Sequence, residues 1–135
     1  MKQQLIYILS APVLFLLTTS SESSPKPKIV AVDENQKDST LKLSVGDQLE
    51  ISLPGNPTTG YAWVLSAVKP AILEQLGDLE YKPVTPAFGS GGRFTLRLKA
   101  ISPGESPVEL DYRRSFEALD VPSTDIFRIL VQVKQ

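Results

Sequence analysis

The sequence predicts an all-β protein: an antiparallel β-sandwich or barrel of about seven to eight short strands, without a disulfide. Two observations lead to this prediction. Apolar and polar residues alternate with a period of two along most of the chain, and clusters of turn-forming residues separate the alternating runs. The chain of 135 residues also has no cysteine, so the fold must be stabilised by its apolar core alone.

The clearest alternation runs through residues 93–101, where Phe94, Leu96, Leu98 and Ala100 share one face. Gly46-Asp47 and residues 102–104 mark turns. Similar or weaker runs predict strands at residues 29–32, 41–45, 49–53, 61–65, 80–84, 108–112 and 127–133. Only the segment 70–76, PAILEQL, hints at a helical turn.

Trp63 lies on the apolar face of the strand predicted over residues 61–65. A large aromatic residue at such a position packs into the core of a sandwich. We therefore expect Trp63 to be a core residue and not a contact for a cofactor.

The N-terminus has the pattern of an export signal, with Lys2 followed by a mostly apolar run from Leu5 to Leu17 and then small polar residues. This run is short for a membrane span, which needs roughly 20 apolar residues. The sequence thus predicts a signal peptide over residues 1–23, a linker over 24–28 and one domain over 29–135. We expect an exported protein, periplasmic or secreted, with no membrane association after cleavage; the alternative is an uncleaved N-terminal anchor.

The composition argues against several classes of function. The formal net charge of −1 offers no basic stripe for nucleic acid. The absence of histidine and cysteine removes the commonest general base, a thiol nucleophile and the commonest metal ligands. We therefore expect no catalytic residue, no metal and no cofactor. A monomer is the default expectation for the oligomeric state.

Three connections between predicted strands contain more than the residues that a simple turn requires. The segment PGNPTTG, residues 54–60, combines two prolines that restrict φ with two β-branched threonines. A loop this stiff loses little entropy when it docks on a partner, although many such segments are only structural turns. The segment TPAFGSGGR, residues 85–93, is rich in glycine and precedes a strand, which argues against a phosphate-binding loop.

The third connection is DYRRSFEALDVPST, residues 111–124. It places two arginines and a phenylalanine, residue types that are enriched at binding hot spots, between two strands. Phe116 breaks the alternation of the preceding strand, so we expect its side chain to be exposed.

These motifs, NPTTGYAW, GSGG and YRRSFE, occur in an order and at a spacing that resemble the chagasin family of cysteine-peptidase inhibitors. The similarity extends to VGDQLEISLP and to the terminal F-x-I-x-V-x-V pattern. The resemblance implies an immunoglobulin-like β-sandwich and reversible, tight inhibition of papain-like cysteine peptidases. It further implies that three loops at one end block the active-site cleft of the peptidase, with the first loop in the middle.

The peptidase-binding residues that the resemblance implies come from all three motifs: Asn56, Pro57, Thr58, Thr59, Gly60, Tyr61, Gly89, Ser90, Gly91, Gly92, Arg114, Ser115 and Phe116. The third motif usually reads Arg-Pro-Trp in the family, so Ser115 and Phe116 depart from it. A more flexible loop and a smaller ring are expected to weaken binding by about tenfold.

Two other functions are compatible with the sequence. An exported immunoglobulin-like module could bind a protein without inhibiting it, and the altered third motif favours this alternative. An enzyme would need a pair of carboxylates, for which Glu105, Glu109, Asp111 and Glu117 are candidates. These four residues occupy expected solvent-facing positions, so the enzyme is the weakest hypothesis.

Overall fold

The computed structural model describes residue 12 and residues 26–135. Apart from residue 12, the predicted signal peptide lies outside the described residues, as does the start of the predicted linker. No helix within the described part of the chain has the length and apolar character needed to cross a membrane.

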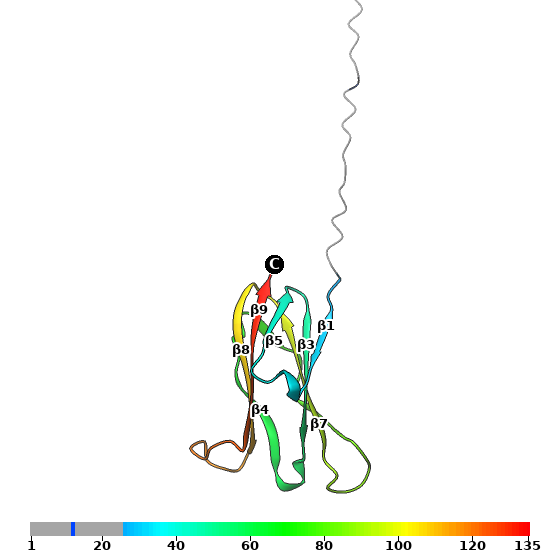
Figure 1. The fold of residues 1–135 in the computed structure, drawn as a ribbon, viewed down its shortest axis with the longest axis vertical. Helices are drawn as coiled ribbons and strands as arrows, with labels where there is room; N and C mark the ends of the chain where they lie inside the picture. Colours follow the sequence, from blue (N-terminus) through cyan, green and yellow to red (C-terminus); the bar gives the residue numbers. More distant parts are fainter. Residues whose placement is uncertain (1–11, 13–25) are drawn as a thin grey trace, which may run out of the picture.

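Two β-sheets pack face to face in a sandwich (Figure 1). In the first sheet, β1 (Ile29–Val32), β3 (Gln48–Gly55) and β7 (Gly92–Ala100) lie in that order, and β7 also pairs with the two short strands β5 (Leu73–Gln75) and β6 (Glu80–Pro83). The second sheet has the order β2 (Thr40–Ser44), β9 (Asp125–Lys134), β8 (Gly104–Arg114) and β4 (Tyr61–Ala67). Two short 3-10 turns complete the described elements: η1 (Glu34–Gln36) and η2 (Pro57–Thr59).

The predicted all-β sandwich is confirmed, but the strands are not all antiparallel. The pairs β1/β3 and β2/β9 are parallel, whereas the remaining pairs are antiparallel. β1 and β2 follow each other in the chain but belong to opposite sheets, and each pairs with a strand that does not follow it directly in the chain, so no hairpin imposes an antiparallel arrangement on these pairs.

The described residues form nine strands, one more than the upper end of the predicted range. The additional strand is β5, which lies where the sequence hinted at a helical turn. One turn does form, since the amide of Leu73 donates to the carbonyl of Lys69 at 3.0 Å. The chain then extends because Leu73 pairs with Ala100 at the edge of the sheet and becomes buried.

The core is built from the apolar faces that the period-two pattern predicted. Leu49, Leu98 and Val131 are completely buried, as are most of their neighbours on the same faces. Trp63 is 6% exposed and its indole Nε1 donates to the carbonyl of Pro54 at 2.9 Å, which confirms its role as a core residue. Burial of each large apolar side chain contributes about 1.5–3 kcal/mol, so this core can replace disulfides.

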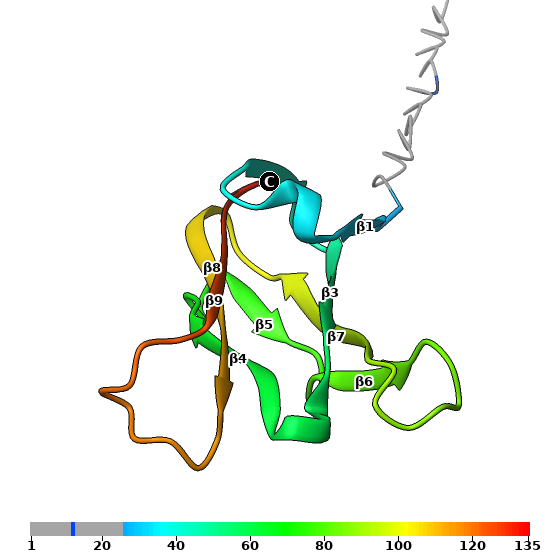
Figure 2. The same cartoon turned by 60° about the horizontal axis from the view of Figure 1, so that its bottom comes forward.

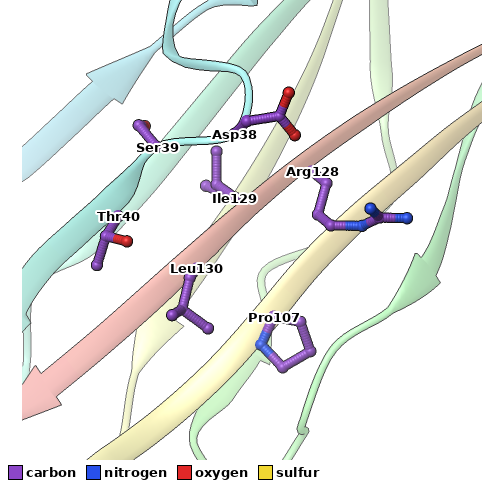
Figure 3. A pocket seen from close by; sticks show the side chains of 7 residues that line it. All are labelled: Asp38, Ser39, Thr40, Pro107, Arg128, Ile129 and Leu130. Atoms are coloured by element: carbon purple, nitrogen blue, oxygen red, sulfur yellow. The ribbon is translucent and has the colours of Figure 1, made fainter.

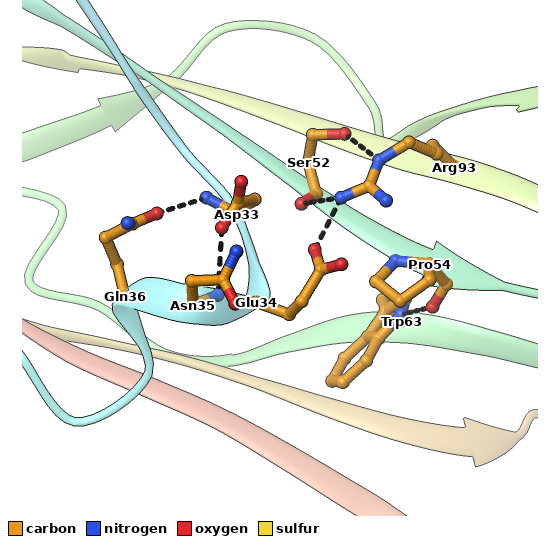
Figure 4. A network of polar contacts seen from close by, with 8 residues as sticks. All are labelled: Asp33, Glu34, Asn35, Gln36, Ser52, Pro54, Trp63 and Arg93. Carbon is orange, nitrogen blue, oxygen red and sulfur yellow. Dashed lines mark hydrogen bonds and ion pairs between the residues drawn. The ribbon is translucent and has the colours of Figure 1, made fainter.

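A polar cluster holds η1 against the first sheet (Figure 4). Arg93, at the start of β7, donates to the hydroxyl of Ser52 at 2.7 Å and to the carboxylate of Glu34 at 2.6 Å. The bond from Arg93 holds the pKa of Glu34 below its usual value. The side chain of Asp33 caps the turn by accepting from the amide of Asn35.

Asp47 closes the turn between β2 and β3 at the end of the sandwich where the domain begins. Its carboxylate accepts from the amide of Ser44 at 2.8 Å and from the amide of Lys28 at 3.2 Å, and the residue is 4% exposed. The bond from the Ser44 amide is the main reason that the pKa of Asp47 is lowered in the folded protein. The carboxylate thus ties Lys28, which lies just before β1, to the turn between the two sheets.

We expect Asp47→Ala to lower the free energy of unfolding at pH 7 by about 1–3 kcal/mol, because two backbone donors lose a charged acceptor. Since folding lowers the pKa of Asp47, this stabilisation is present above the unfolded pKa of about 3.9 and is lost as the pH falls below it. Denaturant unfolding of both proteins between pH 3 and pH 7 measures the difference. Asp78→Ala, at an exposed bend, is the control. If the free energies of unfolding of the wild type and Asp47→Ala differ by the same amount at pH 3 and pH 7, the role for Asp47 is contradicted.

Candidate functional site

Three loops leave the same end of the sandwich, opposite the C-terminus (Figure 1). We name them the finger loop (residues 56–60), the glycine loop (residues 84–91) and the C-terminal loop (residues 115–124). The strand register brings them together, because Gly55 and Pro83 both pair with Gly92, and Tyr61 pairs with Arg114. The finger loop lies between the other two, which spread to opposite sides of it (Figures 1 and 2).

The finger loop is a closed 3-10 turn. The side chain of Asn56 accepts from both the amide and the hydroxyl of Thr58, at 3.1 Å and 2.6 Å. At the other end, the amide of Gly60 donates to the carbonyl of Pro57 at 2.9 Å. These bonds leave Thr58 and Thr59 exposed at the tip of a turn whose shape is set from within.

Asn56 also connects the finger loop to β8 and to the glycine loop. Its backbone amide donates to the Tyr112 hydroxyl at 2.8 Å, and its side-chain Nδ2 donates to the carbonyl of Gly89 at 3.0 Å. Tyr112 belongs to β8 of the second sheet, and its ring stacks on Tyr61 and packs against Trp63. The finger loop is thus held by β8 as well as by β3 and β4, the strands from which it emerges.

Gly60 has φ = +86°, in the left-handed region where a side chain is strained. A Cβ at this position would also lie 2.7 Å from the ring of Phe116. The finger loop and the C-terminal loop therefore touch at Gly60, and only a glycine lets them approach so closely.

The glycine loop places its predicted residues in different environments. Gly89 and Ser90 are exposed and Gly91 is half-buried. Gly92 is buried within β7, where a Cβ would lie 2.1 Å from the carbonyl of Lys82, so this glycine permits the pairing of β6 with β7. A groove of about 190 Å³ is lined by residues of both the glycine loop and the finger loop, among them Phe88 and Thr58.

In the C-terminal loop, Ser115 and Phe116 are exposed, as expected for Phe116, whose exposed fraction is 71%. Arg114 is not free at the surface. Its guanidinium lies over the ring of Tyr61 at 4.4 Å, and its Nη1 is 3.6 Å from the carboxylate of Glu117. The amide of Glu117 also donates to the carbonyl of Arg114, which closes a turn with Phe116 near its apex.

Sequence reasoning missed the part played by Tyr112, which ends the alternating run predicted as a strand over residues 108–112 and so shares its apolar face. The ring does pack there, but the hydroxyl reaches the finger loop, and the accompanying bond to the carbonyl of Asn56 is 3.3 Å long. A tyrosine that ends an alternating apolar run is a signal for such a role, because its polar tip needs a partner.

The remaining candidates do not form a site. Of the four carboxylates considered for an enzyme, Glu109 pairs with Arg128 at 2.9 Å, and Glu117 lies beside Arg114. The concave surface of about 290 Å³ beside Asp38 and Arg128 lies on β2, β8 and β9 and includes none of the predicted site residues (Figure 3). Within residue 12 and residues 26–135 there is no cluster of three or more acidic, histidine or cysteine side chains that could hold a metal.

We expect Tyr112→Phe to retain the aromatic packing but to release the finger loop, because the Asn56 amide loses its acceptor. The free energy of unfolding should fall by about 1 kcal/mol, and hydrogen exchange at the Asn56 amide should become faster. Tyr81→Phe is the matched control, since the Tyr81 ring also packs on an aromatic neighbour, Phe94. Unchanged exchange at Asn56 in Tyr112→Phe would show that this bond does not order the finger loop.

Comparison with known proteins identifies the family. The model of the chagasin family of peptidase inhibitors, I42, matches residues 42–131. Chagasin from Trypanosoma cruzi is 34% identical over 99 residues, which cover 70% of this chain and 87% of chagasin.

Solved structures agree with this match. EhICP2, a cysteine protease inhibitor from Entamoeba histolytica, superposes with a TM-score of 0.69 at 24% identity, over 82% of this chain and 99% of EhICP2, which establishes the fold. PbICP-C, solved in complex with falcipain-2, aligns with a TM-score of 0.54 at 25% identity, over 79% of this chain and 99% of PbICP-C. The predicted immunoglobulin-like sandwich is confirmed, and since the family consists of inhibitors, the enzyme hypothesis loses its support. The chain belongs to the chagasin family of peptidase inhibitors.

Proposed function

We propose that this protein is a reversible, tight-binding inhibitor of papain-like cysteine peptidases and that its three loops block the active-site groove. The observation that carries the proposal is the exposed Thr58-Thr59 tip, held from within and flanked by two outer loops at one end of the sandwich. Membership of the chagasin family supports it, as does the PbICP-C complex with falcipain-2.

The backbone of the finger loop explains how it could occupy the groove without being cleaved. A peptide is cleaved when its carbonyl carbon is presented to the nucleophile in a near-attack geometry. Residues 57–59 form a 3-10 turn, and Gly60 follows in a left-handed conformation, so the tip is not an extended substrate strand. The hydrogen bonds from Asn56 and Gly60 hold this conformation while the loop is bound.

Preorganisation of the finger loop would account for tight binding. Ordering a flexible residue costs about 1–2 kcal/mol, and the finger loop avoids most of this cost because Asn56 and Tyr112 already fix it. We expect an interface of standard size, about 1,600 Å² in total. Such an interface, largely preformed, is compatible with nanomolar affinity.

The outer loops would contact the walls of the groove. Gly89 and Ser90 expose backbone for close approach, and Phe116 exposes most of its ring. Because Arg114 already lies between Tyr61 and Glu117, we propose that it supports Phe116.

The alternative of a binding module without inhibitory activity is not favoured, because the matched family is one of inhibitors. Titration of papain with the protein that lacks the predicted signal peptide, residues 24–135, separates the two functions. Export to the periplasm or the medium is also our proposal and depends on residues 1–23. N-terminal sequencing of the protein recovered outside the cytoplasm would test it, with a start near residue 24 as the expected result.

We expect Thr59→Arg to weaken inhibition of papain by at least about 100-fold, because a long charged side chain at the tip cannot enter the groove with the finger loop. Thr59→Arg should leave thermal stability unchanged, since its side chain is exposed and forms no bond that shapes the turn. Thr58→Arg should weaken inhibition similarly but also loses the hydroxyl bond to Asn56, so a small loss of stability is expected for it. Inhibition constants from competitive titrations measure the effect. Thr40→Arg, the same substitution at an exposed position of β2, is the matched control; equal inhibition by the tip variants and the control would refute insertion of the finger loop.

A further inference from the structure

Each outer loop contains a four-residue turn with a large apolar residue at its first corner. In the glycine loop, the amide of Ser90 donates to the carbonyl of Ala87 at 3.4 Å, so Phe88 occupies the corner. In the C-terminal loop, the amide of Val121 donates to the carbonyl of Ala118 at 3.0 Å, so Leu119 occupies the equivalent corner. The two turns lie on opposite sides of the finger loop (Figure 2).

These two corner residues contribute almost nothing to the core. Phe88 is 106% exposed and Leu119 is 88% exposed, more than any other large apolar side chain of the described residues. Turn corners normally carry proline, glycine, asparagine, aspartate or serine, each for a conformational reason that does not apply to phenylalanine or leucine. One exposed apolar residue is ordinary, but two at matching corners beside the candidate site indicate a contact surface.

Polar contacts hold both turns in place without using the apolar side chains. Nη2 of Arg113 donates to the carbonyl of Ala118 at 3.0 Å and to that of Val121 at 3.4 Å, so it spans the turn that carries Leu119. The side chain of Asn56 donates to the carbonyl of Gly89, the residue after Phe88. Each apolar side chain is thus presented by a turn that is tied to the strands or to the finger loop.

We propose that Phe88 and Leu119 are two apolar anchors that bind hydrophobic surfaces on opposite walls of the same peptidase groove. The inference rests on the proposed function, because it takes the inhibited peptidase as the partner. Phe88 lines the groove beside Thr58, so it would contact the peptidase close to the finger loop. Leu119 lies beyond Phe116 in the C-terminal loop and extends the contact on the other side.

The test compares Phe88→Ser, Leu119→Ser and the double variant in the protein without its predicted signal peptide, residues 24–135, with papain and cathepsin L as peptidases. We expect inhibition to weaken by about tenfold for Phe88→Ser and about fivefold for Leu119→Ser, mainly through faster dissociation. The double variant should lose roughly the product of the two, since the turns are far enough apart to act independently. Phe88→Leu should recover most of the inhibition, because it keeps an apolar side chain at the corner.

Ile29→Ser is the matched control, because Ile29 is 65% exposed at the start of β1, at the opposite end from the loops. It should leave the inhibition constants unchanged, and melting temperatures should be equal for all single variants. Equal inhibition by Phe88→Ser, Leu119→Ser and the wild type would overturn the anchor proposal and leave the proposed function intact. A loss of inhibition that is fully explained by a lowered melting temperature would have the same consequence. A wild-type domain that inhibits neither enzyme would overturn the proposed function, and the anchors with it.

Discussion

The hydrogen bonds between the Tyr112 hydroxyl and the backbone of Asn56 are the contact on which the rest of the site depends. Tyr112 belongs to the second sheet, whereas Asn56 follows β3 of the first, so this contact joins the sheets at the end where the loops emerge. The stacked rings of Tyr61 and Tyr112 and the adjacent Trp63 fill the space below it. The core therefore extends up to the base of the finger loop, so the packing that stabilises the sandwich also restrains the tip of this loop.

The three loops are coupled to one another through short polar or steric contacts. Asn56 bonds to Gly89 of the glycine loop, and Gly60 receives the ring of Phe116 from the C-terminal loop. The binding end thus resembles one preformed surface more than three independent loops. A change in either outer loop is expected to reach the finger loop through these two contacts.

The C-terminal loop shows how the chain tolerates its departure from the usual Arg-Pro-Trp motif. Serine at position 115 does not stiffen the backbone as proline would. The turn is instead closed by the amide of Glu117, and the guanidinium of Arg114 packs on Tyr61 at 4.4 Å and lies 5.7 Å from the ring of Phe116. A backbone hydrogen bond and the packing of the Arg114 side chain therefore provide the order that proline provides in the usual family motif.

The sequence by itself determined the all-β fold, the apolar faces of most strands and the three motifs that lead to the family. Alternation with a period of two reports which face of a strand is buried, and turn residues report where strands end, so these properties are local. Only the tertiary structure decided the parallel pairings of β1 and β2, the strand β5, the burial of Gly92 and the internal contacts of Arg114. Each of these depends on which segments lie side by side. The bond between Tyr112 and Asn56 joins residues separated by 56 positions in the chain, a distance over which no local pattern carries information.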